Sequence, residues 1–190
     1  MILVFLSRKH KSAQKKHTNR NNSYMKKIGY ILFLLIVLTG CKQENYLDWK
    51  ALNEAWLEHN KTQPGVITTS SGLQYKQLNP SPNPTESRPN YNSTVFVDYK
   101  LYLICSYDDH NYTYNSPRLL QEGKDAVFSM SNVVKGFSEG LHMMRVHDDF
   151  ALYIPYQLGY GAEGTGSAGY YGFIPPYSTL IYEVHLKGMQ

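Results

Sequence analysis

The sequence predicts an α+β fold, in which one short helix lies on a β-sheet, and three observations lead to this prediction. Residues 94–103 alternate apolar and polar side chains, as a half-buried strand does. Residues 150–186 contain two more alternating segments on either side of a long glycine-rich loop. Residues 132–144 repeat apolar side chains at helical spacing, which gives one apolar stripe. Strand and helix periodicities in separate segments are typical of this class.

Length and composition allow one core domain with appendages. The chain has 190 residues, is 42% hydrophobic and carries a net charge of +4. Residues 1–40 hold eight of the nineteen Lys and Arg and no acid, which leaves eleven bases against fifteen acids, a net charge of −4, for the remainder. This acidic remainder lacks the basic face that nucleic-acid binding requires, so no nucleic-acid partner is expected.

Residues 25–40 have the pattern of a lipoprotein signal peptide. Met25 and two lysines precede the apolar run 28–38, which is shorter than the ~20 residues that span a bilayer. The Leu-Thr-Gly-Cys sequence that ends at Cys41 resembles a bacterial lipobox, in which the cysteine becomes the lipidated N-terminus. An ordinary signal peptide followed by a chance cysteine is the alternative. Residues 1–24, polar and basic, are expected to be an upstream start-site artefact.

With Cys41 lipidated, Cys105 has no intrachain partner and no disulfide is expected. Catalysis by Cys105 is the alternative, but no partner lies at a suggestive spacing, so a passive thiol is favoured. The histidines show no metal-ligand spacing. The pairs Asp108-Asp109 and Asp148-Asp149 fall in predicted turns, where solvated carboxylates are expected.

The segments before the first clear strand are predicted in order. Residues 42–61 are expected to form an amphipathic helix that docks a partner or makes a dimer contact or, as we favour, packs on its own domain or serves as a stalk. Residues 65–78 form strand-like pieces around a Ser-Gly turn, and residues 79–92, with four prolines, form a surface loop.

The remaining strands frame an apolar pocket. Residues 94–103 direct Tyr99 inward, residues 126–130 form a short strand, and residues 150–154 and 180–186 flank the loop. The loop carries many tyrosines among glycines that let it bend, and an Ile-Pro-Pro turn fixes its exit. Its Gly-x-Gly-x-x-Gly run lacks the following helix that a dinucleotide site needs.

Five segments together resemble the FK506-binding-protein (FKBP) type of peptidyl-prolyl isomerase, in the bacterial secreted branch that includes macrophage infectivity potentiator proteins. These segments are SGLQYKQL, VFVDYKLYL, VVKGFSEGLHMMRV, LYIPYQLGYGAEGTG and FIPPYSTLIYEVHL. The resemblance covers about residues 65–188. It implies a strongly bent antiparallel sheet, a half barrel, wrapped around one short helix, with the domain at 65–190 and a lipid-anchored linker at 41–64.

The resemblance also implies a proline pocket. Its residues would be Tyr99, Tyr114, Asn115, Val133, Val134, Phe137, Tyr160, Ile174 and Tyr182. The Val134 N–H and the Tyr160 hydroxyl would bind ligand carbonyls, and Phe137 would form the floor, where the family usually has Trp.

The chain departs from the family pattern at several of these positions. Asn115 replaces a usual Asp, Ala126 replaces a frequent aromatic residue and Tyr182 replaces Phe. The loops at 104–112 and 168–172, which would flank the pocket, are longer than usual.

The resemblance implies an isomerase that assists folding of exported proteins by binding the twisted X-Pro imide, with no cofactor or metal. Rotation of this bond faces a barrier of roughly 18–20 kcal/mol, which an apolar pocket lowers because the twisted state has less charge separation. A catalytically weak peptide-binding or chaperone module of the same fold is the alternative.

The implied partners are proline-containing peptides or unfolded exported proteins, macrolides of the FK506 type, and the membrane through the lipid anchor. The implied location is the bacterial cell envelope, at the periplasmic or surface face of the outer membrane. A monomer is expected, because the extended N-terminal dimerisation region of some relatives is not recognised in the sequence.

Overall fold

The computed structural model describes residues 46–105 and 117–190. The predictions for the signal peptide, Cys41, Tyr114 and Asn115 lie outside these residues. Within the described ranges, no helix is both long enough and apolar enough to cross a membrane.

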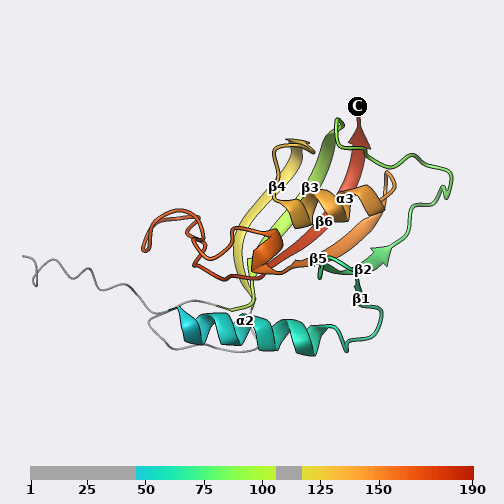
Figure 1. The fold of residues 1–190 in the computed structure, drawn as a ribbon. Helices are drawn as coiled ribbons and strands as arrows, with labels where there is room; N and C mark the ends of the chain where they lie inside the picture. The colour runs from blue at the N-terminus through green and yellow to red at the C-terminus, as the bar shows by residue number, and fades with distance from the viewer. Residues whose placement is uncertain (1–45, 106–116) are drawn as a thin grey trace, which may run out of the picture. The chain divides into compact units, whose positions relative to one another are not determined.

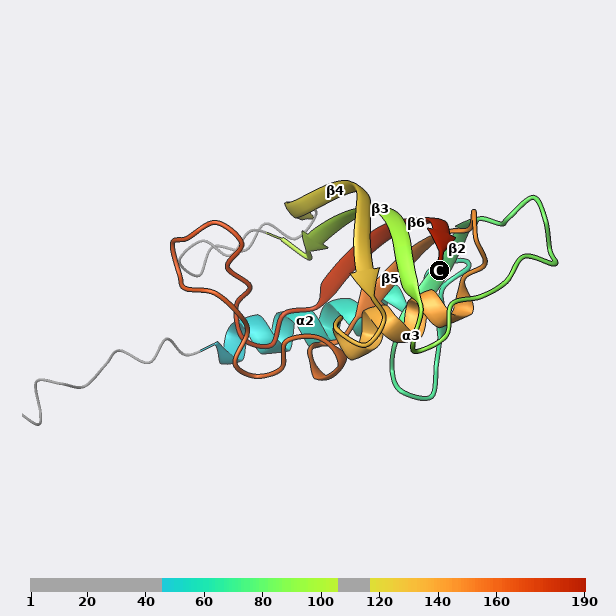
Figure 2. The ribbon, with the colours of Figure 1, turned by 90° about the horizontal axis from the view of Figure 1, so that it is seen from above.

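Six strands form one antiparallel sheet, and α3 lies on one of its faces (Figures 1 and 2). The elements are α2 (Leu47–Asn60), β1 (Ile67–Thr68), β2 (Gln74–Asn79), β3 (Thr94–Leu103), β4 (Arg118–Ser129), α3 (Lys135–Met143), β5 (Asp149–Ile154), the 3-10 helix η1 (Tyr156–Leu158) and β6 (Leu180–Met189). The strand order is β1-β2-β5-β6-β3-β4. The predicted α+β class and curved antiparallel sheet are confirmed, as is the short helix against it.

Helix α3 approaches the sheet closely because two glycines face β5. A Cβ atom on Gly136 would lie 2.4 Å from Cγ2 of Ile154, and one on Gly140 would lie 2.4 Å from Cδ1 of Leu152. The spacing of four residues puts both glycines on one side of the helix. The predicted apolar stripe is buried at Phe137, 2% exposed, and at Leu141, fully buried. The main core therefore lies between α3 and the inward side chains of the strands.

Helix α2 packs at the end of the sheet where β3 and β5 finish and β6 begins (Figure 1). Trp49 is fully buried there in a second apolar cluster with Ile104, Cys105 and Ile181. Because Ile181 alternates with the inward-facing Tyr182, this cluster lies on the outer face of the sheet. The helix thus packs on its own domain, as the favoured interpretation predicted.

Strand β4 is longer than the strand predicted at residues 126–130, since it begins at Arg118. Its first half is mostly exposed and lacks apolar alternation. Among the described strands it lies at the edge of the sheet and pairs with β3 alone. An edge strand is held by backbone hydrogen bonds on one side, so its sequence can be polar on both faces, which explains why periodicity did not predict it.

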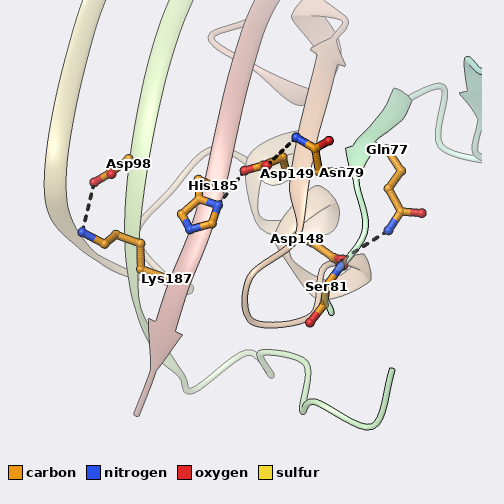
Figure 3. Close-up of polar contacts among 8 residues, drawn as sticks. All are labelled: Gln77, Asn79, Ser81, Asp98, Asp148, Asp149, His185 and Lys187. Atoms are coloured by element: carbon orange, nitrogen blue, oxygen red, sulfur yellow. Dashed lines mark hydrogen bonds and ion pairs between the residues drawn. The ribbon is translucent and has the colours of Figure 1, made fainter. Parts of the chain in front are cut away.

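Asp148 is buried, and the prediction that its carboxylate is solvated is wrong. The side chain is 1% exposed and accepts three hydrogen bonds. Oδ1 accepts from the Ser81 N–H at 2.6 Å and from Nε2 of Gln77 at 3.2 Å (Figure 3). Oδ2 accepts from the Arg145 N–H at 2.7 Å. The carboxylate therefore joins β2, the following loop and the segment after α3.

Candidate functional site

Four aromatic rings from four elements meet on the inner face of the sheet. Tyr99 on β3 lies 5.5 Å from Phe128 on β4 and 6.1 Å from Tyr182 on β6, measured between ring centroids. Phe137 on α3 lies 4.5 Å from Tyr182 and 5.8 Å from Phe128. The rings are tilted or edge-to-face, the arrangements that aromatic pairs prefer. Three predicted pocket residues, Tyr99, Phe137 and Tyr182, thus form one aromatic wall together with Phe128.

Tyr160 lies at the exposed side of this wall. It is 38% exposed, and its phenol is close enough to Tyr99 and Tyr182 to affect the pKa of both hydroxyls. Burial is the largest cause of the raised pKa of Tyr182, and the neighbouring phenols of Tyr160 and Tyr99 raise it further. Burial likewise raises the pKa of Tyr99 most, followed by Tyr171 and Tyr160. The hydroxyls of Tyr99 and Tyr182 are therefore protonated and able to donate hydrogen bonds near neutral pH.

The other predicted residues pack beside the wall. Val133 and Val134 are partly buried against the main core, and Ile174 is 3% exposed in it. The backbones of Ile174 and Thr165 exchange two hydrogen bonds of 2.9 Å, which fixes the base of the glycine-rich loop. The Val134 N–H just precedes α3 and donates to no other described residue, so it is available to a ligand. The ligand-binding roles of all these residues stay predictions.

Phe128 and Tyr171 are pocket neighbours that the sequence analysis missed. Phe128 lies two positions after Ala126 and two before Met130, on the same face of the extended chain, and this spacing could have indicated that it points inward. Tyr171 belongs to the expanded part of the loop and is 90% exposed. No periodicity there indicated that its phenol lies near Tyr99.

Gly123 allows Tyr99 to occupy its place. The two residues pair across β3 and β4, and a Cβ atom on Gly123 would lie 2.7 Å from Cε1 of Tyr99. We expect Gly123→Ala to displace the Tyr99 ring and to cost about 1–3 kcal/mol in unfolding free energy, the usual cost of overpacking. Urea denaturation measures this cost. Gly188→Ala is the control, because its Cβ would meet only Cδ2 of Phe96 at 3.8 Å. Equal costs for the two variants would contradict the close contact.

The buried tyrosines make stability sensitive to alkaline pH. The pKa of Tyr182 is raised in the folded state, so the folded chain holds this proton above about pH 10, where the unfolded chain releases it. The contribution of this group to the free energy of unfolding should therefore be constant below about pH 10 and fall above it, by up to about 1.4 kcal/mol per pH unit. Urea denaturation at about pH 9 and about pH 11 should show a smaller decrease for Tyr182→Phe. An unchanged decrease would contradict the prediction.

A cavity of about 520 Å³ lies among the strands, and Tyr99 of the aromatic wall is one of its lining residues. Eight of its twelve lining residues are charged, Asn or His. Asp149 accepts from Nδ1 of His185 at 2.5 Å in this region, and Lys187 pairs with Asp98 at 3.7 Å (Figure 3). Lys187 also pairs with Asp125, so these side chains are engaged with one another. The inner wall has the apolar character that the predicted chemistry requires, so we take it as the candidate site.

Two other kinds of chemistry find little support in the described residues. No group of three or more His, Cys, Asp or Glu side chains there could hold a metal ion. Cys105 is 1% exposed, and burial raises the pKa of its thiol, which disfavours the reactive thiolate. This agrees with the passive thiol that the sequence favours.

Comparison with known proteins decides the family. The model of the FKBP-type peptidyl-prolyl cis-trans isomerase family matches residues 85–187. The chain belongs to this family. A second model, of the domain amino-terminal to FKBP-type peptidyl-prolyl isomerases, matches residues 33–76. A stretch related to such an N-terminal domain is therefore present, and it includes α2, β1 and the start of β2. The monomer stays a prediction.

Similar FKBP-family proteins include two bacterial relatives with 34% identity. The outer membrane protein MIP of Legionella longbeachae aligns over 137 residues, 72% of this chain and 52% of that protein. The peptidyl-prolyl cis-trans isomerase Mip of Coxiella burnetii aligns over 135 residues, 70% of this chain and 52% of that protein. The chain thus spans about half the length of these relatives.

Solved structures agree with the FKBP fold. FkpA from Escherichia coli superposes with a TM-score of 0.62 at 28% identity, over 75% of this chain and 60% of that one. A peptidyl-prolyl isomerase from Pseudomonas syringae gives a TM-score of 0.64 at 22% identity, over 79% of this chain and 99% of that one. The bent sheet around one helix is therefore the FKBP arrangement.

Proposed function

We propose that this FKBP-family chain catalyses cis-trans isomerisation of X-Pro peptide bonds. The observation that carries the proposal is the aromatic wall, in which Phe137 lies 4.5 Å from Tyr182 and Tyr182 lies 6.1 Å from Tyr99. An apolar surface of this kind suits a proline ring. It also favours the twisted imide, whose charge separation is smaller than that of the planar bond.

The side chains around the wall have distinct roles in this proposal. Phe137 supports the proline ring from below, and Tyr99 and Tyr182 flank it. The Val134 N–H and the Tyr160 hydroxyl donate to carbonyl groups on either side of the proline and hold the peptide while the bond rotates. Because the rotation breaks no covalent bond, the proposed reaction requires no nucleophile among the residues of the wall. The family resemblance implies that Asn115 and Tyr114, outside the described residues, also belong to the pocket.

The test is catalysed isomerisation of short X-Pro peptides by the full chain, with several residues before the proline. We expect the rate constant to rise in proportion to protein concentration. Tyr160→Ala should lower kcat/KM, and Tyr160→Phe should lower it by a similar factor if the hydroxyl is the binding group. Folded protein that does not accelerate any of the peptides would overturn the proposal.

A second candidate function is peptide binding without efficient catalysis. Ala126 on β4 is partly buried beside the core and offers no ring to the pocket, and the exposed Tyr170 and Tyr171 extend an aromatic surface beyond it. Asn115 in place of the usual Asp favours the same function. Isothermal titration with the same peptides separates the two candidates, because this module would bind peptides that it does not isomerise.

We further propose that the chain acts in the bacterial cell envelope on proline-containing segments of unfolded exported proteins. The relative from Legionella longbeachae is named an outer membrane protein, and Cys41 follows a lipobox-like sequence here. The anchor would hold residues 41–64 as a linker at the membrane and the domain at 65–190 beyond it. Incorporation of labelled fatty acid in wild type but not in Cys41→Ser would support the anchor, and equal labelling would refute it.

Two finer points of this proposal concern ligands and assembly. The wall would also accept macrolides of the FK506 type, which competition with peptide isomerisation tests. The protein would act as a monomer, which sedimentation velocity tests.

A further inference from the structure

The N-terminal helix α2 contacts the loop that carries the pocket wall through buried hydrogen bonds. Nε1 of Trp49 donates to Oγ of Ser178 at 3.0 Å, and this hydroxyl donates to the Pro175 carbonyl at 2.7 Å. Trp49 is fully buried and Ser178 is 3% exposed. Pro175 directly follows Ile174. A continuous series of hydrogen bonds therefore runs from α2 to the backbone next to a predicted pocket residue.

Asn53 makes a second connection one turn further along α2. Its Oδ1 accepts from the Thr179 N–H at 2.7 Å, and its Nδ2 donates to the Trp49 carbonyl at 2.8 Å. The side chain is 1% exposed, so water does not compete for these bonds. Since both ends of the amide are engaged, Asn53 fixes the loop and its own orientation together.

The segment at 175–179 has a backbone that needs such support. Tyr177 has φ of +63°, an unfavourable value for a residue with a side chain. Its ring packs edge-to-face on Tyr156 at 5.2 Å, and Nζ of Lys50 lies 5.5 Å and 5.9 Å from the centroids of the Tyr177 and Tyr156 rings. Lys50 is also on α2, so three residues of this helix hold the segment.

Both ends of the segment lead into the candidate site. Ile174 stands immediately before it, and β6 begins immediately after it at Leu180, two residues before Tyr182. A shift of the segment would therefore move Ile174 and the first residues of β6.

We propose that Trp49 and Asn53 are positioning residues, through which α2 sets the place of Ile174 and Tyr182 in the pocket. The inference rests on the proposed function for its effect on catalysis, because α2 itself contributes no side chain to the aromatic wall. Its effect on the position of the segment is independent of any activity. A helix outside the sheet-and-helix core would thus determine the shape of the pocket.

The test compares Trp49→Phe with Trp56→Phe in the full chain. Trp49→Phe keeps an aromatic ring but removes the donor to Ser178. Trp56 lies on the same helix and packs its ring on Tyr153 at 5.7 Å, so the same replacement there leaves the bonds to the segment intact. We expect Trp49→Phe to lower kcat/KM at least fivefold with a larger change in KM than in kcat, and Trp56→Phe to stay within twofold of wild type.

Nuclear magnetic resonance gives a readout that needs no catalysis. Trp49→Phe should shift the methyl signals of Ile174 and the backbone amide of Tyr182, whereas Trp56→Phe should leave both in place. Asn53→Ala should reproduce the shifts of Trp49→Phe. If wild type is inactive, the proposed function fails while these shifts still support positioning. Unmoved signals, or equal effects of the two tryptophan variants on signals and kcat/KM, would overturn the inference.

Discussion

Phe137→Ala is expected to lower the free energy of unfolding by about 3–5 kcal/mol and to reduce kcat/KM for X-Pro peptides more than tenfold. Phe137 is 2% exposed and its ring touches both Phe128 and Tyr182, so its removal opens a cavity in the core and takes away the support of the aromatic wall. Urea denaturation gives the stability, and the peptide assay at a temperature where the variant stays folded gives the activity.

Leu141→Ala provides the matched control for this variant. Leu141 lies one turn further along α3 and is fully buried, so its truncation should cost about 2–5 kcal/mol. It is not one of the four rings of the wall, and we expect its activity per folded molecule to remain close to that of wild type. Similar losses of activity in the two variants would mean that general destabilisation, rather than the wall, explains the result.

Asp148→Ala should be the most damaging replacement of a polar residue, with a loss of about 3–5 kcal/mol in unfolding free energy. The change leaves the part-buried N–H groups of Ser81 and Arg145 without their acceptor and removes the link between three segments of chain. Each unsatisfied buried donor costs about 1–3 kcal/mol. Thermal and urea unfolding measure the loss.

Asp149→Ala is the neighbouring control. Its carboxylate accepts from exposed Asn79 at 2.8 Å and from half-buried His185, and both partners can turn to water once it is removed. We expect a loss of about 1 kcal/mol or less. If Asp149→Ala is as costly as Asp148→Ala, then the hydrogen bonds of Asp148 are not what distinguishes the two sites.

The elements with strict periodicity were predicted most closely from the sequence. Residues 94–103 alternate without interruption and form β3 with these same bounds. The stripe at 132–144 became α3, which begins a few residues later, after Val133 and Val134. In both cases one face is buried against one core, so the apolar pattern and the structure carry the same information.

Features that depend on long-range contacts were not predicted. The first half of β4 is held by hydrogen bonds to its neighbour β3 rather than by an apolar face. Its hydrophobic pattern therefore does not indicate a strand. Asp148 follows a turn, which suggests solvation, but residues more than sixty positions earlier surround it. The bonds of Trp49 and Asn53 join positions 129 and 126 residues apart.

The candidate site was predicted through resemblance more than through pattern. Alternation alone directed Tyr99 and Tyr182 inward, and helical spacing buried Phe137. Only the resemblance placed Tyr160 and Ile174 beside them, because the glycine-rich loop between β5 and β6 has no periodicity that fixes its path. Tyr171 was missed for the same reason.

The position of β6 in the sheet also constrains the order in which the chain can fold during synthesis. Among the described strands, β6 comes last along the chain, yet it lies between β5 and β3 and hydrogen-bonds to both. Until the ribosome has released residues 180–189, β2 and β5 cannot join β3 and β4, and Trp49 has no Ser178 to bind. The complete sheet therefore cannot form on a shorter nascent chain. The domain reaches its native state only after β6 has been translated.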